Sequence, residues 1–204
     1  MNERIIRVLD KIWKLDLEQQ EIERVHGDKH FDFRDRVISV GPDTGNLLYV
    51  LARHSGAKTI LEAGTSYGYS TLWLGAAAQE NGGKVYTFDI EPKKIARAKA
   101  NFEKAGLGEI ITQIEGDFCT GVKNIIGALQ ADIVFIDALK DEYPRYFDAV
   151  FPHVRKGGLI VADNMEYPEH FKEAAFNYEK HIRKYHVSTQ RLKIGWGLEV
   201  TIKK

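Results

Sequence analysis

Apolar residues along most of the chain fall into two alternating patterns. From residue 59 onward, short runs of consecutive apolar residues predict strands, and the segments between them carry apolar residues three and four positions apart, which predicts helices. The expected strands are 59–63, 84–89, 110–115, 131–136 and 158–162. The expected helices between them are about 69–80, 92–105, 118–128 and 143–154. Strands that alternate with helices are typical of a parallel sheet with helices on both faces.

The N-terminal segment has a helical pattern of its own. Residues 2–25 predict one or two amphipathic helices, 26–35 a loop, and 44–54 a further helix that stops before Gly56. These helices could pack on the core, cap a substrate pocket or join a partner subunit, as in a homodimer. The apolar positions expected to share one face are Ile5, Leu9, Ile12, Trp13, Ile22 and Val25.

The last quarter of the chain departs from the alternation. A long helical stripe runs from Phe171 to Tyr185, and two strand-like runs at 187–193 and 197–202 predict a hairpin. The fold class expected is therefore α/β, a Rossmann-like doubly wound sheet, mostly parallel, with a C-terminal antiparallel hairpin. Because no linker composition divides the chain, residues 1–204 are expected to form one domain, with 1–36 as an N-terminal extension.

Composition narrows the classes of function. Lys plus Arg equals Asp plus Glu at 29 each, so bulk charge does not favour nucleic acid or an anionic membrane. The single Cys119 excludes an internal disulfide, fits a buried residue better than a nucleophile, and suits a reducing cytosol. The charged N-terminus resembles neither a signal peptide nor a membrane span. Scattered histidines do not suggest zinc, and Lys180, Arg183 and Lys184 favour a solvated face over an RNA-binding strip.

The stretch Thr59–Ala78 predicts a strand, a glycine-rich turn and a helix. Gly64 and Gly68 have the spacing Gly-x-x-x-Gly, which differs from the Gly-x-Gly-x-x-Gly of dinucleotide enzymes. Glycines allow a ligand to approach the backbone closely, and in open α/β sheets such turns lie where ligands bind. A tight structural turn would require the same residues.

Two acids follow the next strands at the same edge. Asp89 ends the second strand, where a carboxylate can accept hydrogen bonds from both hydroxyls of a ribose, or can cap the following helix. Asp117 follows the third strand and could meet an adenine amino group, although helix capping explains it equally well.

The fourth and fifth strands end in a set of oxygen ligands. Asp137 ends one strand, and Asp163 and Asn164 end the other. Side chains alternate along a strand, so Asp163 and Asn164 share a target only if the chain leaves strand geometry there. Two carboxylates and an amide oxygen suit Mg²⁺, Mn²⁺ or Ca²⁺. Lys140 lies near this set and is a candidate base for a hydroxyl proton; the alternative is an exposed lysine paired with Asp141 or Glu142.

From about Val37 to the C-terminus, the sequence resembles the cation-dependent O-methyltransferases, which include catechol and caffeoyl-coenzyme A O-methyltransferases. The motifs that carry the resemblance are SVGPDTGNLL, LEAGTSYGYSTL, FDIEP, VFIDALKDEYPRYF, GGLIVADN and IGWGLEV. It implies S-adenosylmethionine as cofactor, Asp137, Asp163 and Asn164 as ligands of a divalent cation, and Lys140 as the catalytic lysine. The cofactor contacts it implies are Val40, Glu62, Gly64, Thr65, Ser66, Ser70, Asp89, Asp117 and Asp137.

The expected activity is methyl transfer from S-adenosylmethionine to a hydroxyl of a catechol-like or other vicinal-oxygen acceptor. Residues between Asn164 and Gly197 look unlike the plant and animal members, so the acceptor does not carry over. Some bacterial relatives methylate a hydroxylated tRNA base, which leaves that acceptor open. Two rival functions are a nicotinamide oxidoreductase, which the glycine spacing disfavours, and a non-catalytic nucleoside-binding module.

Overall fold

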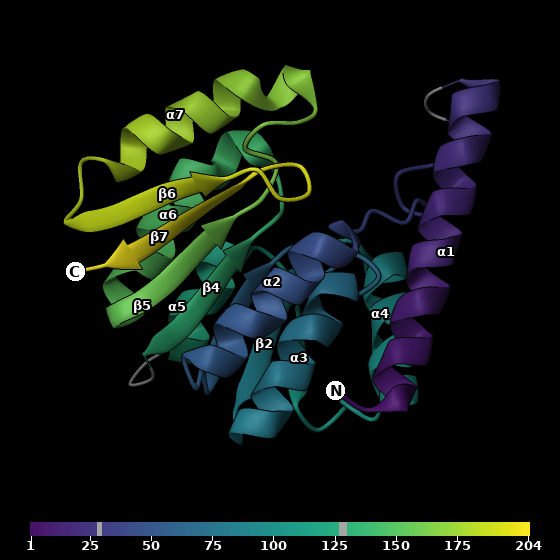
Figure 1. Ribbon diagram of the computed structural model, residues 1–204, viewed down its shortest axis with the longest axis horizontal. Helices are drawn as coiled ribbons and strands as arrows, with labels where there is room; N and C mark the ends of the chain where they lie inside the picture. The colour runs from purple at the N-terminus through teal and green to yellow at the C-terminus, as the bar shows by residue number, and fades with distance from the viewer. Residues whose placement is uncertain (28–29, 127–129) are drawn as a thin grey trace.

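The computed structural model describes residues 1–27, 30–126 and 130–204, and its strands form one seven-stranded sheet (Figure 1). The strand order is β3-β2-β1-β4-β5-β7-β6; β1 to β5 pair in parallel, and β7 pairs antiparallel with both β5 and β6. This confirms the predicted fold class, including the C-terminal hairpin. The strands are β1 (Thr59–Ala63), β2 (Lys84–Asp89), β3 (Ile111–Glu115), β4 (Ala131–Ile136), β5 (Val154–Ala162), β6 (Val187–Leu192) and β7 (Leu198–Lys203).

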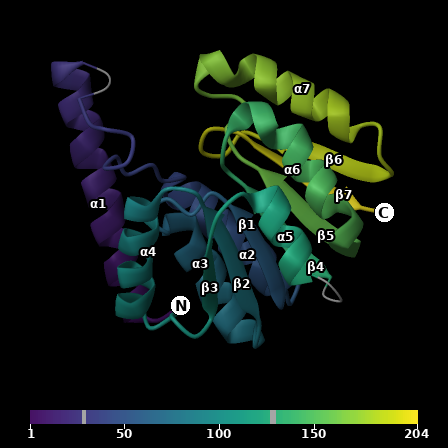
Figure 2. The same cartoon turned by 180° about the vertical axis from the view of Figure 1, so that it is seen from behind.

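Helices cover both faces of the sheet and create two separate apolar cores (Figures 1 and 2). Successive strand residues enter opposite cores, as Ile60 and Leu61 do, because side chains alternate along a strand. Both faces of the central strands β1 and β4 are therefore buried, which explains why these strands are mostly apolar. The helices on one side are α1 (Glu3–His26), α2 (Gly41–His54), α3 (Tyr69–Asn81) and α4 (Pro92–Ala105), and on the other α5 (Phe118–Ile126), α6 (Tyr143–Val150) and α7 (Lys172–Ile182).

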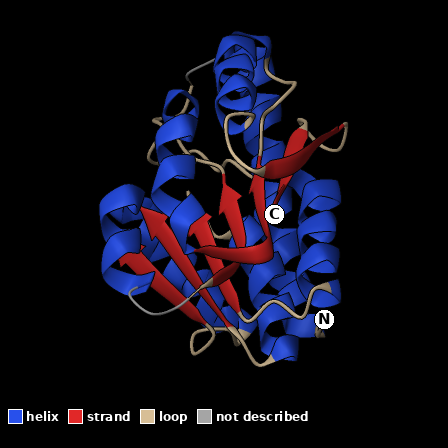
Figure 3. Cartoon of the chain, turned by 90° about the vertical axis from the view of Figure 1, so that its left-hand side faces the viewer, coloured by secondary structure: helices blue, strands red, loops and turns tan. Residues whose placement is uncertain are grey.

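The register of the parallel strands brings their carboxyl ends to a common edge (Figure 3). Ala63 of β1 lies between Phe88 of β2 and Ile136 of β4, and Ile136 in turn lies beside Ala162 of β5. The residues that follow these positions therefore leave the sheet side by side. They are Gly64, Asp89, Asp137 and Asp163.

Helix α1 is one continuous helix, and its buried face is only partly the predicted one. Ile5, Leu9 and Ile12 are buried, whereas Ile22 and Val25 are 38% and 58% exposed, so core packing holds for only some of the six apolar positions. The buried positions in the C-terminal half are polar instead. They are Asp16, Gln19 and Glu23.

These polar side chains hold the segment that leads into α2. Asp16 accepts hydrogen bonds from the backbone N–H of Ser39, at 3.1 Å, and from the Ser39 hydroxyl. Glu23 forms an ion pair with Arg36 at 2.6 Å. Burial of Asp16 and Glu23 is tolerated because each has a partner in the segment that precedes α2, Asp16 in Ser39 and Glu23 in the Arg36 side chain. Helix α1 thus fixes residues 35–39 as well as adding to the core.

Several predicted boundaries are corrected. The helix expected over 143–154 ends at Val150, because a short 3₁₀ turn (Phe151–His153) containing Pro152 follows, and Val154 already belongs to β5, where it pairs with Ala131. Residues 127–128 of the helix expected over 118–128 lie outside the described residues. Helix α2 begins three residues earlier than expected, and α7 is shorter because a 3₁₀ turn (Glu169–Phe171) precedes it. In the described parts of the chain, no helix is long and apolar enough to cross a bilayer.

Candidate active site

The glycine turn after β1 contacts the backbone of β4. Gly64 has φ of +98°, and a Cβ at this position would overlap the carbonyl oxygen of Asp137. The Asp137 N–H in turn donates to the Ala63 carbonyl at 2.9 Å. Gly68 has φ of +84° and lies directly against the ring of Phe102. Both glycines are therefore required for the close packing of this turn, whether or not a ligand approaches it.

Asp89 fixes the shape of the same turn. One carboxylate oxygen accepts the N–H of Ser66 at 2.8 Å, and the other accepts the N–H of Glu91 at 2.9 Å. Ser66 adopts φ of +46°, and its hydroxyl is buried without a hydrogen-bond partner among the described residues. Asp89 is half-buried at the edge of the sheet, so each oxygen keeps a second acceptor direction for a ligand.

Glu62 is buried and its carboxylate is surrounded by hydroxyl groups. It accepts hydrogen bonds from Ser70 at 2.6 Å, from Thr87 at 2.6 Å, and from Thr71. Burial raises the pKa of Glu62 to about 7, the hydroxyl donors oppose that rise, and the nearby Asp137 adds to it. The structure thus gives Glu62 and Ser70 an internal role between β1, β2 and α3; a direct contact with a ligand stays a prediction for both.

The remaining predicted cofactor residues take different positions. Thr65 shares a 2.6 Å hydrogen bond with Thr87, and Val40 is buried immediately before α2. Asp117 accepts the N–H of Thr120 at 3.0 Å at the start of α5. Partial burial would raise the pKa of Asp117, but the hydrogen bonds from Thr120 and the charge of Arg145 outweigh it and lower the pKa. The structure thus supports the helix cap predicted for Asp117, and the adenine contact stays a prediction.

Lys140 and Asp137 form an ion pair at the end of β4. The Lys140 Nζ lies 2.5 Å from Asp137 Oδ1, and the two side chains are 11% and 17% exposed. The ammonium also lies 5.3 Å from the ring centroid of Tyr143 and 5.8 Å from that of Phe171. The alternative of an exposed lysine paired with Asp141 or Glu142 is therefore wrong.

Asp163 and Asn164 meet the condition stated from the sequence. Strand β5 ends at Ala162, and Asn164 adopts φ of +59°, so the chain leaves strand geometry between the two side chains. The Asn164 side-chain nitrogen donates to the Tyr167 carbonyl at 3.1 Å, which leaves its amide oxygen available. Asp163 is buried, and its Oδ1 has no hydrogen-bond partner among the described residues. Burial raises the pKa of Asp163, as does the charge of Asp137, while Lys140 lowers it.

This arrangement fits a divalent cation. A buried carboxylate oxygen without a partner is costly, and a cation with oxygen ligands would satisfy it. Within the described ranges, no group of three or more His, Cys, Asp or Glu side chains is placed to hold a metal. A site at this edge would therefore need the amide oxygen of Asn164 beside the carboxylates of Asp137 and Asp163.

The β6–β7 turn lies against the segment that follows β5. The N–H groups of Glu166 and Tyr167 donate to the Trp196 carbonyl at 3.0 and 3.1 Å, and that of Met165 donates to Gly197 at 3.0 Å. The rings of Tyr167 and Trp196 are exposed and meet edge to face with centroids 6.0 Å apart. An exposed aromatic pair thus stands within a few residues of Asn164, and sequence reasoning did not anticipate it.

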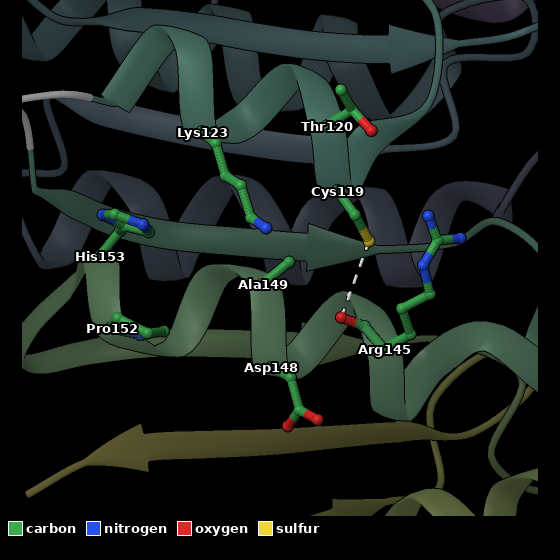
Figure 4. Close-up of a pocket in the computed structure, with 8 residues that line it drawn as sticks. All are labelled: Cys119, Thr120, Lys123, Arg145, Asp148, Ala149, Pro152 and His153. Carbon is green, nitrogen blue, oxygen red and sulfur yellow. Dashed lines mark hydrogen bonds between the residues drawn. The ribbon is translucent and has the colours of Figure 1, made fainter.

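A groove between α5 and α6 is separate from these residues (Figure 4). Cys119 is buried at its edge, as predicted, with its thiol 3.7 Å from the Arg145 carbonyl oxygen, and burial raises its pKa. A thiol held in the protonated form is a poor nucleophile. None of the predicted site residues lines this groove, whose lining residues are Cys119, Thr120, Lys123, Arg145, Asp148, Ala149, Pro152 and His153.

Two further segments differ in how well they match the prediction from the sequence. Lys180, Arg183 and Lys184 are exposed, in agreement with a solvated face. Helix α4 buries Lys94, whereas Ile95, which the periodicity favours for the core, is only half-buried. Periodicity alone could not find Lys94, because a lysine on an inner helix face contradicts the apolar pattern from which that face is recognised.

Comparison with known proteins places the chain in a family. A family model described as O-methyltransferase matches residues 21–195. A catechol O-methyltransferase from Niastella koreensis is 40% identical over 130 residues, which is 63% of this chain and 58% of that protein. A catechol O-methyltransferase from Mycobacterium tuberculosis is 33% identical over 128 residues, 63% of this chain and 57% of that protein. The alignments thus span less than two thirds of these relatives.

A solved structure shows the same similarity over a greater length. The O-methyltransferase from Bacillus cereus in complex with SAH superposes with a TM-score of 0.78 at 25% identity, covering 97% of this chain and 91% of that one. The chain belongs to the O-methyltransferase family, as its sequence motifs indicated. Family membership sets aside the nicotinamide oxidoreductase.

Proposed function

We propose that this protein transfers the methyl group of S-adenosylmethionine to a hydroxyl of a catechol-like acceptor and requires a divalent cation. The observation that carries the proposal is the meeting of Asp137, Lys140, Asp163 and Asn164 at the carboxyl edge, beside the glycine turn and Asp89. S-adenosylmethionine is the methyl donor expected for this family, and the Bacillus cereus relative was solved with SAH.

The residues that would hold the cation are Asp137, Asp163 and Asn164. Asp163 offers a buried oxygen without a partner among the described residues, and Asn164 offers an amide oxygen whose companion nitrogen is already used. When bound, a divalent cation supplies charge stabilisation to an acceptor oxygen that is losing its proton. Mg²⁺, Mn²⁺ and Ca²⁺ all suit an all-oxygen ligand set.

Lys140 is placed to receive the acceptor proton. Its Nζ lies at the same edge, partly buried against the rings of Tyr143 and Phe171. For this step Lys140 must be in its neutral amine form, so its ammonium first gives a proton to solvent. The acceptor hydroxyl then gives its proton to the Lys140 amine, the hydroxyl oxygen bonds the methyl carbon, and the carbon–sulfur bond breaks to leave S-adenosylhomocysteine (SAH). Asp89 and the turn around Ser66 would hold the donor so that the methyl group faces that oxygen, and such positioning supplies much of the rate.

The acceptor proposed is an aromatic ring with two adjacent oxygens. Tyr167 and Trp196 present exposed aromatic faces close to Asn164, which suits a flat ring. The relatives named catechol O-methyltransferase support the same class.

A methyl-transfer screen tests the proposal. Labelled S-adenosylmethionine is offered with catechol, caffeate, phenols with a single hydroxyl, and tRNA, each with Mg²⁺ and with excess EDTA. We expect label in the vicinal diols only, and only with Mg²⁺. Label in tRNA alone would move the acceptor to a nucleic acid base, and binding of S-adenosylmethionine without transfer to any acceptor would favour a non-catalytic module.

A further inference from the structure

Lys94 is a lysine on the inner face of a helix. It lies in the first turn of α4, one turn before Ala98 on the stripe that also buries Phe102, and it is 3% exposed. Lysine is among the residue types least often buried, so this position needs an explanation that core packing does not give.

The Lys94 ammonium has an aromatic neighbour but no ion-pair partner among the described residues. Its Nζ lies 3.8 Å from the ring centroid of Phe33. Across residues 1–27, 30–126 and 130–204, no carboxylate lies within ion-pair distance of this nitrogen, and no hydrogen bond from it is found. Burial lowers the pKa of Lys94, while Asp89 and Glu91 oppose that change. A buried ammonium whose only close partner is the face of an aromatic ring still has N–H groups that make no hydrogen bond.

The surroundings place this ammonium on the Asp89 side of the site. Asp89 accepts the N–H of Glu91 at 2.9 Å, which ties the start of α4 to the end of β2. The segment that carries Phe33 is fastened to the same region, since Asp35 pairs with Lys93 at 3.0 Å. The Asp35 carbonyl also accepts the Tyr67 hydroxyl, at 3.2 Å, from the glycine turn. Lys94 therefore lies against Phe33 at the start of α4, which Asp89 and Asp35 both hold.

We propose that Lys94 is a further nucleoside-binding residue, whose ammonium donates a hydrogen bond to a ribose oxygen while Asp89 accepts from the ribose hydroxyls. Phe33 covers the ammonium from the solvent side. A hydroxyl group both donates and accepts hydrogen bonds. The Lys94 ammonium would donate to the diol and the Asp89 carboxylate would accept from it, whereas a carboxylate alone can only accept. This inference rests on the proposed S-adenosylmethionine site and adds a residue and a covering segment to it.

Binding of SAH, measured by titration calorimetry, tests the role of Lys94. The variants are Lys94→Met and, as a matched control, Lys99→Met, which removes an exposed lysine from the same helix. Each protein is titrated with SAH and with its 2′,3′-dideoxyribose analogue. We expect Lys94→Met to bind SAH about tenfold or more weakly, as for loss of a hydrogen bond from a charged group. We expect it to bind the dideoxy analogue as the wild type does, and Lys99→Met to change neither affinity.

Thermal unfolding separates this role from a structural one. Removing an unpaired buried charge should leave the melting temperature of the ligand-free protein unchanged or higher. Native SAH affinity in Lys94→Met, or an equal loss for SAH and the dideoxy analogue, would overturn the inference and leave the proposed function standing. Failure of the wild type to bind SAH would overturn both. If Lys94→Met does not fold, Lys94→Leu, which also lacks a hydrogen-bond donor, serves instead, with the same expected loss specific to the ribose hydroxyls.

Discussion

Each acidic side chain at the carboxyl edge has a different kind of partner. Asp89 accepts backbone N–H groups, Asp137 faces an ammonium, and Glu62 is surrounded by hydroxyls. Asp163 alone among these four has a buried oxygen without a partner in the described structure. These differences separate the acids that shape the site from the one whose environment requires a ligand.

Asp89→Asn tests the ribose contact at the residue scale. The asparagine keeps an oxygen for one of the backbone N–H groups, so the turn should persist, but the charge that strengthens ribose binding is lost. We expect SAH affinity to fall by roughly tenfold, since hydrogen bonds to charged groups contribute about 1.5–3 kcal/mol. Calorimetry measures it, with the exposed Asp141→Asn as control. An unchanged affinity in the folded variant would remove Asp89 from the cofactor site.

Lys140→Met tests proton transfer. If Lys140 receives the acceptor proton, kcat should fall by ~10²–10⁴, the usual contribution of a general base. SAH affinity should be little changed. Lys140→Arg should not restore activity, because arginine stays protonated. Near-native kcat in Lys140→Met, with an unaltered profile of kcat against pH, would make the lysine a bystander.

At the scale of elements, Glu62 joins two strands and a helix through hydroxyl groups. Ser70 and Thr71 come from α3 and Thr87 from β2, while Glu62 itself belongs to β1. A fully buried carboxyl with only neutral donors favours its protonated form, which is the cause of its raised pKa.

Glu62→Gln should therefore change how stability depends on pH. An acid whose pKa is raised on folding loses stability as pH rises from its unfolded value to its folded one, because the unfolded chain releases the proton first. For Glu62 that window runs from 4.5 to about 7. Glu62→Gln should gain stability relative to wild type across this window, by about 3 kcal/mol at most. Denaturant unfolding at pH 4, 5.5, 7 and 8 measures it, and a constant difference between the two proteins would contradict the account.

Apolar periodicity predicted the elements whose buried positions are apolar. It did not predict the positions that are buried because a polar side chain has a partner elsewhere in the fold. Strands β2 and β4 and helix α4 have the expected bounds because apolar runs, Pro92 and Gly106 mark them. The buried face of α1 beyond Ile12 could not be predicted from an apolar pattern, because its buried residues are polar. They pair with groups in the segment that precedes α2. Lys94 was not predicted because it is a charged residue on the inner face of a helix, which an apolar pattern does not mark. Val154 was placed in a helix because its pairing with Ala131 depends on the folded sheet.

What could be predicted about the candidate site is the edge of the sheet that its residues share, because the order of the strands alone determines that edge. Parallel strands must bring Asp89, Asp137 and Asp163 to one edge, so their proximity follows from the order of elements. The left-handed backbone of Asn164 could be stated only as a condition, because no local sequence pattern specifies it; in the structure, residues 165–167 that follow are hydrogen-bonded to the β6–β7 turn. Tyr167 and Trp196 lie together because the β6–β7 turn is hydrogen-bonded to residues 165–167. No local sequence pattern indicates a contact between residues so far apart in the chain.

At the scale of the whole molecule, the carboxyl edge of the sheet has two halves. The strands β1 and β2, with their turns, would hold the methyl donor, and β4 and β5, braced by the C-terminal hairpin, would hold the cation and the acceptor. The halves meet where Gly64 lies against Asp137. Methyl transfer should therefore require both, and loss of the cation site should abolish transfer without loss of donor binding.

The most direct test is the rate of methyl transfer to catechol as a function of free Mg²⁺, for wild type and Asp163→Asn, with SAH affinity measured on the same samples. We expect no transfer by wild type in excess EDTA, and recovery with Mg²⁺ or Mn²⁺. We expect Asp163→Asn to stay nearly inactive at all Mg²⁺ concentrations while its SAH affinity remains native. Full activity of the wild type in excess EDTA would contradict the account and leave Asp137, Asp163 and Asn164 without a role in holding a cation.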